Sequence, residues 1–129
     1  MINVNMIETI LYVENQELSC NFYKKLLRCN PQLDVPGMTE FALSDTFKLG
    51  LMPNQGIAKI LADKTPHPQE GTAIPRCELY FTTNNIQDEY ANALDAGAIL
   101  ISPIIKRNWG ADVCYFSDPD GHIIAFSQA

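Results

Sequence analysis

Two glutamates stand in matching contexts in the two halves of the chain. Glu8 opens the segment ETILYVEN and Glu78 opens the segment ELYFTTNN, and both segments are rich in strand-forming residues. If both carboxyl groups face one cavity they repel each other, so one keeps its proton at neutral pH or a cationic ligand settles between them. The alternative is that both lie near strand ends and reach solvent, the common position of glutamate.

Aromatic residues are the second set with ligand-binding potential. Trp109 lies in an expected loop before the last hairpin, where an indole could stack on a planar or cationic ligand. A structural lid or a contact with a second subunit is the alternative for this residue. The other aromatic candidates are Tyr12, Tyr80, Tyr115 and Phe126. We predict that the ligand-binding residues are Glu8, Tyr12, Glu78, Tyr80, Trp109 and Tyr115.

The sequence contains no recognisable motif for nucleophilic, nucleotide-dependent or zinc-protease catalysis. The sequence has no GxSxG, P-loop, GxGxxG or HExxH motif, and its two histidines, His67 and His122, fall in a polar loop and a turn. A cysteine nucleophile needs a neighbouring base, and neither Cys77 nor Cys114 has an evident partner in its apolar strand. No catalytic residue is therefore assigned.

Charge and cysteine usage limit the classes of partner. Fifteen acidic and nine basic residues give a net charge of -6, the wrong sign for binding nucleic acid or an anionic membrane. The four cysteines form no CxxC pair, so we expect free thiols in a reducing compartment. No apolar run approaches the ~18 residues that a membrane span requires. The expected location is the cytoplasm.

The strands and helices that position these candidate residues are expected to occur twice along the chain. A strand at 7–13, a helix over about 18–27 and three extended segments fill the first half, and the second half repeats that order after a looser stretch. The boundaries fall at about 1–53 for module one, 54–75 for a linker and 76–129 for module two. On the first helix the expected apolar face is Leu18, Phe22, Leu26 and Cys29. The expected core also includes Phe41, Phe47, Phe81, Phe116, Tyr90 and Leu94.

Aligning Glu8 with Glu78 also aligns Asn15 with Asn85, so that the two helices begin at equivalent points. Three motifs accompany this repeat: ILYVENQELSCNFYKKLL at 10–27, DAGA at 95–98 and WGADVCYFSDPDGH at 109–122. With this repeat, the whole chain resembles the vicinal oxygen chelate superfamily of glyoxalases, bleomycin-resistance proteins and extradiol dioxygenases. The resemblance implies an α+β fold in which two tandem β-α-β-β-β modules form curved mixed sheets around a cleft.

The resemblance also implies where a metal ion would bind. Metal-dependent members take one ligand from the first and one from the last strand of each module, which here are Glu8, Gly50, Glu78 and Ala125. Gly50 and Ala125 offer no donor atom, whereas a catalytic transition metal needs about three protein ligands. We expect no cofactor; if a divalent ion such as Mg²⁺ binds, Glu8 and Glu78 are the candidate ligands.

Two functions therefore remain from the sequence. The first, which we favour, is a binding protein of the bleomycin-resistance type that sequesters a small cationic or aromatic molecule in a cleft shared by a homodimer. The second is a divalent-metal-dependent lyase, isomerase or dioxygenase of the glyoxalase type. Because one scaffold hosts many chemistries, the fold does not decide between them.

Overall fold

The computed structural model describes all residues, 1–129, and resolves two units of compact structure, Met1–Thr72 and Ala73–Ala129. Unit one contains β1 (Ile7–Val13), α1 (Gln16–Leu27), β2 (Leu33–Val35), β3 (Met38–Ser44), β4 (Phe47–Pro53), α2 (Asn54–Leu61) and the 3₁₀ turns η1 (Ala62–Lys64) and η2 (Pro68–Gly71). Unit two contains β5 (Glu78–Thr82), α3 (Ile86–Asp95), β6 (Ile99–Lys106), β7 (Asp112–Ser117) and β8 (Ile123–Gln128). The predicted α+β fold of two β-α-β-β-β modules is confirmed.

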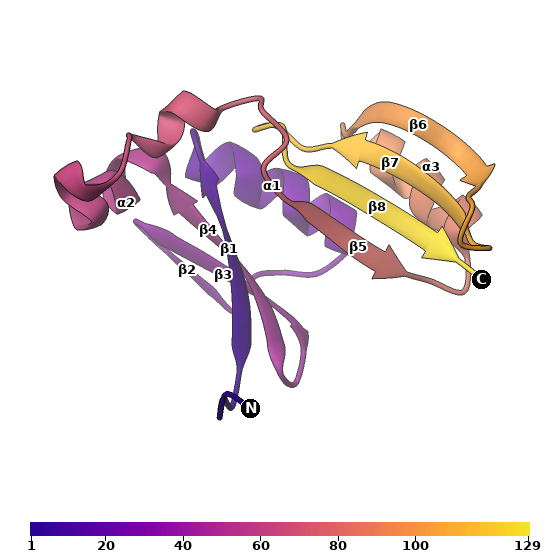
Figure 1. Cartoon of the computed structure of the whole chain (residues 1–129), viewed down its shortest axis with the longest axis horizontal. Coiled ribbons are helices and arrows are strands. Elements are labelled where there is room, and N and C mark those ends of the chain that lie inside the picture. Colours follow the sequence, from indigo (N-terminus) through magenta and orange to yellow (C-terminus); the bar gives the residue numbers. More distant parts are fainter. The chain divides into compact units, whose positions relative to one another are not determined.

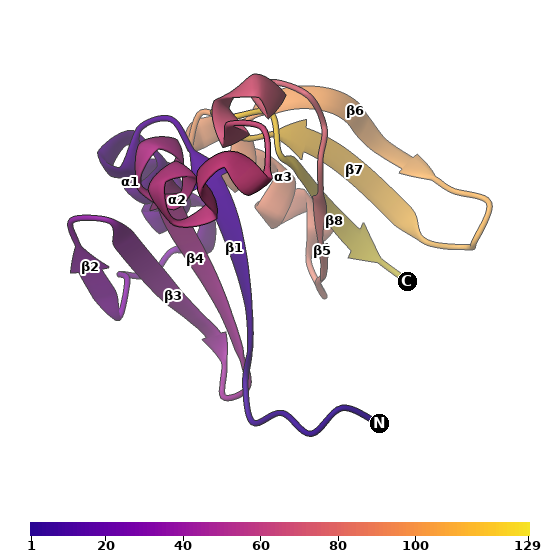
Figure 2. The same cartoon turned by 60° about the vertical axis from the view of Figure 1, so that its left-hand side comes forward.

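Each module folds into a four-stranded mixed sheet with the same strand order. The orders are β1-β4-β3-β2 and β5-β8-β7-β6 (Figure 1). The first and last strands of each module pair in parallel, and the remaining neighbours are antiparallel. One helix of each module, α1 or α3, packs against one face of its sheet, as the second view also shows (Figure 2).

Helices α1 and α3 begin at asparagine caps. The Asn15 side chain accepts a hydrogen bond from the backbone N–H of Leu18 at 3.0 Å, and Asn85 caps α3 by accepting from Asp88 at 3.2 Å. The chain leaves α3 through Gly97, whose φ of +94° lies in the left-handed region that favours glycine. None of the helices is long and apolar enough to span a membrane.

The segment between β4 and β5, where a linker was expected at 54–75, contains short helical elements. It contains α2, η1 and η2, and residues up to Thr72 belong to unit one. Of the residues in α2, Asn54 and Ile57 are buried.

Several side chains expected in the core lie elsewhere. On α1 the buried residues are Ser19, Cys20, Phe22, Tyr23 and Leu26, whereas Leu18 and Cys29 are exposed. The predicted helical face was therefore rotated, because small polar Ser19 also packs against the sheet. Phe41 and Phe116 are buried as predicted, but Phe47 and Phe81 are half-buried and Leu94 is exposed. Tyr90 packs its ring against Phe116, with 5.4 Å between centroids.

Candidate functional site

The face of the first sheet opposite α1 carries the first group of candidate residues. Along β1, Leu11 and Val13 are buried, while Glu8 and Tyr12 are half-buried and Ile10 is partly exposed. This alternation follows from the two-residue period of a strand, which sends neighbouring side chains to opposite faces. We call this surface the open face of module one.

Glu8 lies over Gly50 on this open face. Gly50 is paired with Ile10 on one side and with Glu40 on the other. A Cβ atom added at Gly50 would overlap Oε2 of Glu8 and would lie 3.1 Å from Cγ1 of Ile10. The Oε2 atom is buried and has no hydrogen-bond partner within the protein. The absence of a side chain at position 50 thus makes room for the carboxyl group.

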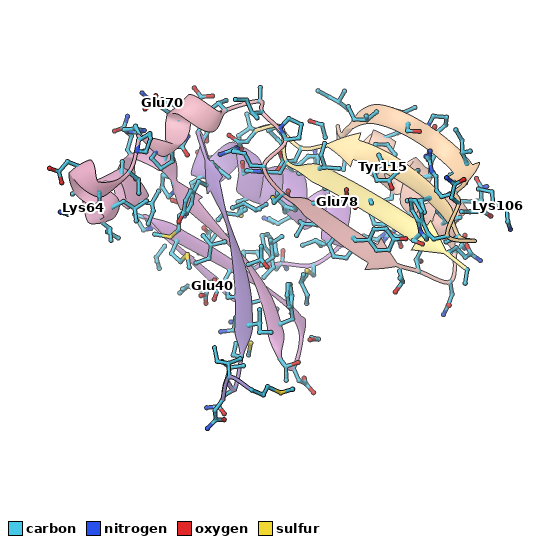
Figure 3. All side chains as sticks on the ribbon, in the orientation of Figure 1. Glu40, Lys64, Glu70, Glu78, Lys106 and Tyr115 are labelled. Atoms are coloured by element: carbon cyan, nitrogen blue, oxygen red, sulfur yellow. The ribbon has the colours of Figure 1, made fainter.

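Glu40, on β3, is the second carboxyl group of this face (Figure 3). Burial raises the pKa of Glu8, and Glu40 raises it further through a hydrogen bond and its negative charge, while the charge of Lys48 lowers it. Nζ of Lys48 lies 3.7 Å from Oε1 of Glu40. The arrangement is a carboxyl pair in which Glu8 holds its proton more tightly than an isolated glutamate does.

Sequence reasoning placed Glu8 but missed Glu40 and Lys48. It compared Glu8 with Glu78, the equivalent residue of the other module. The usable signal was the hairpin of β3 and β4, because pairing Glu40 with Gly50 puts Glu40 on the open face. Buried Thr39 and Phe41 on either side of Glu40 point toward the helix.

The corresponding face of module two carries aromatic residues. Glu78, Tyr80 and Thr82 are exposed along β5, and Leu79 between them is buried. Tyr80 pairs with Ala125, which pairs in turn with Tyr115 on β7. Ala125 is completely buried between the two tyrosine-bearing strands, at the register position that Gly50 holds in module one.

Trp109 and Arg107 complete the open face of module two. Nε1 of Trp109 donates a hydrogen bond to the Tyr80 hydroxyl at 3.1 Å, and the guanidinium carbon of Arg107 lies 5.1 Å from the ring centre of Tyr115. Burial is the main cause that raises the pKa of Tyr115; the charges of Glu78 and Tyr80 raise it, and that of Arg107 lowers it. Glu78, Tyr80, Trp109 and Tyr115 thus lie on one surface, labelled in part in Figure 3.

Arg107 is a residue that sequence reasoning did not select. Its Nη2 donates to the Ser102 hydroxyl at 2.8 Å and to the carbonyl oxygens of Val113 at 2.9 Å and Pro103 at 3.2 Å. Its Nε is buried without a partner. In the sequence, Arg107 stands between Lys106 and Asn108, which is typical of a solvated loop. The carbonyl groups that accept its hydrogen bonds are found only in the three-dimensional structure.

A cavity of about 660 Å³ adjoins this aromatic surface. The lining residues are Tyr80, Thr82, Thr83, Asn84, Ala111, Ser127, Gln128 and Ala129. Its size suits a small organic molecule, and the polar side chains of its lining are hydroxyl and amide groups.

The DPDG turn between β7 and β8 holds a buried polar cluster. Asp118, Asp120 and His122 are 2%, 4% and 3% exposed, and each offers a ligand atom within 4.8 Å of the others. Such a group is able to hold a metal ion. Oδ1 of Asp118 already accepts hydrogen bonds from the backbone N–H groups of Asp120 at 2.8 Å and His122 at 2.9 Å, which fixes the turn.

The expectation that Cys77 has no evident partner was wrong. Its Sγ lies 3.6 Å from Nδ1 of His122, because β5 runs beside the start of β8. Burial and the charge of Asp118 raise the pKa of the Cys77 thiol, while Arg76 lowers it. The thiol therefore remains protonated at neutral pH and is a poor nucleophile.

The four family metal positions offer two donor side chains. Glu8 and Glu78 each carry a carboxylate, but the space at Gly50 is filled by the Glu8 carboxyl group, and Ala125 is buried. Glu8 is half-buried, whereas Glu78 is exposed to solvent. These residues do not fit a transition-metal site of the usual kind, which needs about three protein ligands.

Comparison with known proteins places the chain among glyoxalase-related folds. The model of the Glyoxalase-like domain matches residues 6–129. A glyoxalase-related enzyme from Fulvimarina pelagi is 20% identical with a TM-score of 0.80, over 95% of this chain and 86% of that one. A glyoxalase/bleomycin resistance protein/dioxygenase from Nocardioides is 20% identical with a TM-score of 0.82, over 99% and 85%. Protein ATC0852 from Agrobacterium tumefaciens is 26% identical with a TM-score of 0.76, over 99% and 98%. None of the curated proteins matches the chain.

Proposed function

The chain belongs to the Glyoxalase-like domain family, and from this premise we propose that it binds and sequesters a small cationic or aromatic organic molecule. The observation that carries the proposal is the Glu8 carboxyl group over Gly50. Its Oε2 is a buried acceptor without a donor, and Glu40 adds a second carboxylate beside it. A ligand ammonium group supplies both the donor and the compensating charge.

Module two offers a surface of its own for an aromatic or cationic group. Tyr80 lines a cavity of about 660 Å³, and Trp109 donates a hydrogen bond to the Tyr80 hydroxyl. Ring faces attract both planar groups and cations. The small side chain of Ala125 between Tyr80 and Tyr115 leaves the space above the sheet to these rings.

A titration with benzylamine tests this proposal. Calorimetry is expected to give saturable binding to the wild-type protein, weakened about tenfold by Glu8→Gln or Glu40→Gln, since each removes one carboxylate. Benzyl alcohol has the same ring without the charge and is expected to bind more weakly. Benzylamine binding that both variants leave unchanged would exclude the carboxyl pair as the cation site.

We further propose that the binding cleft is shared by a homodimer. β6 is the outer strand of the second sheet, and it exposes Ile99, Ile101 and Ile105. An apolar edge strand of this kind supports pairing with a second copy of the chain. Light scattering is expected to find a dimer that Ile101→Lys dissociates and that the control Ile60→Lys on α2 leaves intact. A monomeric variant that bound benzylamine as tightly as the dimer does would contradict the shared cleft.

Metal-dependent catalysis is the second candidate function, and the buried cluster in the DPDG turn is a possible metal site that does not support it. Asp118, Asp120 and His122 could hold an ion, but they are at most 4% exposed. A substrate has no access to an ion enclosed in this way, so such an ion would stabilise the turn. No catalytic step is assigned to it.

A further inference from the structure

A second cavity, of about 530 Å³, lies in unit one at the start of α2. The lining residues are Glu14, Asn54, Gln55, Gln69, Glu70 and Thr72. They come from the end of β1, the first turn of α2, and η2 with the residue after it. Every lining residue has an oxygen-bearing polar side chain, so the cavity is built for hydrogen bonding rather than for an apolar group.

Asn54 is the residue that points to a ligand. It is only 5% exposed, and its Oδ1 atom is buried with no hydrogen-bond partner in the protein. A buried polar atom without a partner costs free energy, and a donor placed in the cavity would relieve that cost. A molecule that donates a hydrogen bond to Oδ1 would satisfy Asn54.

The start of α2 adds a second requirement. The helix begins at Asn54, and the residue before it, Pro53, has no side chain that can cap the first backbone N–H groups. These groups are donors at the positive end of the helix. A ligand that fits the site should therefore also carry an acceptor, such as a hydroxyl oxygen.

The charge of the lining selects a cation. Glu14 and Glu70 are carboxylates, and the lining includes no lysine, arginine or histidine. Glu70 is held in place because its Oε2 accepts the backbone N–H of His67 at 3.1 Å. Two carboxylates in a cavity of this volume suit a small organic ion better than a bare metal ion, which needs more ligands drawn around one point.

We propose that this cavity binds a small hydroxylated organic ammonium ion. The ammonium group donates to Oδ1 of Asn54 and is neutralised by Glu14 and Glu70, and the hydroxyl groups accept hydrogen bonds from the first turn of α2. The site is independent of the open sheet faces, because none of its residues belongs to the set formed around Glu8 or Tyr80.

The experiment is a nuclear magnetic resonance titration of the full chain with 2-amino-1,3-propanediol and, in parallel, with glycerol. The two probes have the same shape and differ by an ammonium group in place of the central hydroxyl. We expect saturable shifts at the amides of 54–57 and 69–72 with the amine, at a dissociation constant on the order of millimolar. Glycerol is expected to bind at least tenfold more weakly.

Two variants inside the cavity and two outside it make the assignment specific. Asn54→Asp keeps the shape and adds a negative acceptor, so it is expected to tighten amine binding about threefold or more. Glu70→Gln retains a side chain that can cap η2 and is expected to weaken binding about fivefold. Glu17 does not line this cavity, so Glu17→Gln is the control and should leave amine binding unchanged. The proposal is overturned if no saturable shift occurs, if glycerol binds equally well, or if Asn54→Asp and Glu70→Gln both bind as the wild type does. Glu8→Gln separates the two sites, because it should weaken benzylamine binding and leave the amine diol unaffected.

Discussion

The Glu8 carboxyl group occupies the space that a side chain at Gly50 would fill. In the metal-dependent members that the sequence resembles, the position of Gly50 supplies a ligand to the metal. Here the ligand side chain is absent, and the first-strand carboxylate turns toward the sheet and toward Glu40. The carboxyl pair is thus a direct result of one missing side chain.

Gly50→Ala should displace Glu8 from this position. The new methyl group would overlap Oε2 of Glu8, a flexible end that can swing away, and would crowd Cγ1 of Ile10 at 3.1 Å. We expect a loss of about 1 kcal/mol in the free energy of unfolding, measured in urea. The loss should shrink in the Glu8→Ala background. Gly56→Ala is the control, since nothing lies within 4 Å of its added Cβ atom. Equal losses in both backgrounds would show that Glu8 does not cover residue 50.

The stability of the protein should depend on pH through Glu8. The folded state raises the pKa of this group above its ordinary 4.5, so the folded protein binds the proton more tightly than the unfolded chain does. The resulting stabilisation is complete below pH 4.5 and is lost as pH rises through the raised pKa.

Glu8→Gln removes this dependence. Relative to wild type, the variant should gain up to about 1 kcal/mol of stability as pH rises through that window. Urea unfolding at several pH values between 4 and 8 measures the gain, with Glu78→Gln, an exposed carboxylate, as the control. A constant difference between Glu8→Gln and wild type at all pH values would contradict the raised pKa.

The hydrogen bond from Trp109 to Tyr80 provides an optical signal. Trp109 is the only tryptophan of the chain, and it is 59% exposed. Tyr80→Phe removes its acceptor and should shift the emission spectrum, while costing less than about 1 kcal/mol because the bond is exposed to solvent. Tyr90→Phe, whose ring packs on Phe116, is the control. An unchanged spectrum in Tyr80→Phe would mean that the bond does not form in solution.

Arg107 should control the ionisation of Tyr115. Its positive charge lowers the pKa of the tyrosine against the effects of burial, Glu78 and Tyr80. Arg107→Met should therefore raise that pKa further, which ultraviolet titration can follow with Tyr115→Phe as the reference. The variant should also lose about 1–3 kcal/mol of stability, because Ser102, Pro103 and Val113 lose their shared donor. A fall in the Tyr115 pKa would contradict the assignment.

Removal of metal ions should leave ligand binding intact. We expect protein dialysed against a chelator to bind benzylamine with unchanged affinity, since the proposed contacts are carboxyl and aromatic groups. Elemental analysis of the wild type, of a Glu8→Ala and Glu78→Ala double variant, and of Asp120→Asn locates any ion that copurifies. A near-stoichiometric transition metal that only the double variant loses would overturn the binding proposal and favour an enzyme. Loss only in Asp120→Asn would assign the ion to the DPDG turn.

Most elements of the fold could be predicted from local sequence patterns, and the structure contains them. Strand segments such as 7–13, the caps at Asn15 and Asn85, and the repeat of their order depend on neighbouring residues, so they can be read from one sequence. The rotated face of α1 shows the limit of this approach. Ser19 is buried although it is polar, and Leu18 beside it is exposed, because the position of the sheet decides which side of the helix is covered.

The site depends on register, which local patterns do not provide. Glu40 on β3 lies near Glu8 on β1 because both strands pair with β4 around Gly50. Cys77 meets His122 only because β5 and β8, far apart in sequence, run in parallel. The single residues Glu8, Tyr80 and Tyr115 could be selected by strand alternation, whereas their partners required the strand order of each sheet.

The position of β8 has a consequence for how module two forms during synthesis. β8 lies between β5 and β7, and its residues Ile124, Ala125 and Phe126 are buried. Until 123–128 leave the ribosome, β5 has no neighbouring strand within its own sheet, so the growing chain exposes an unpaired edge. Module one has its own central strand, β4, complete at Pro53. We therefore expect module one to fold during translation and module two only after β8 has emerged, as protease protection of stalled chains would reveal.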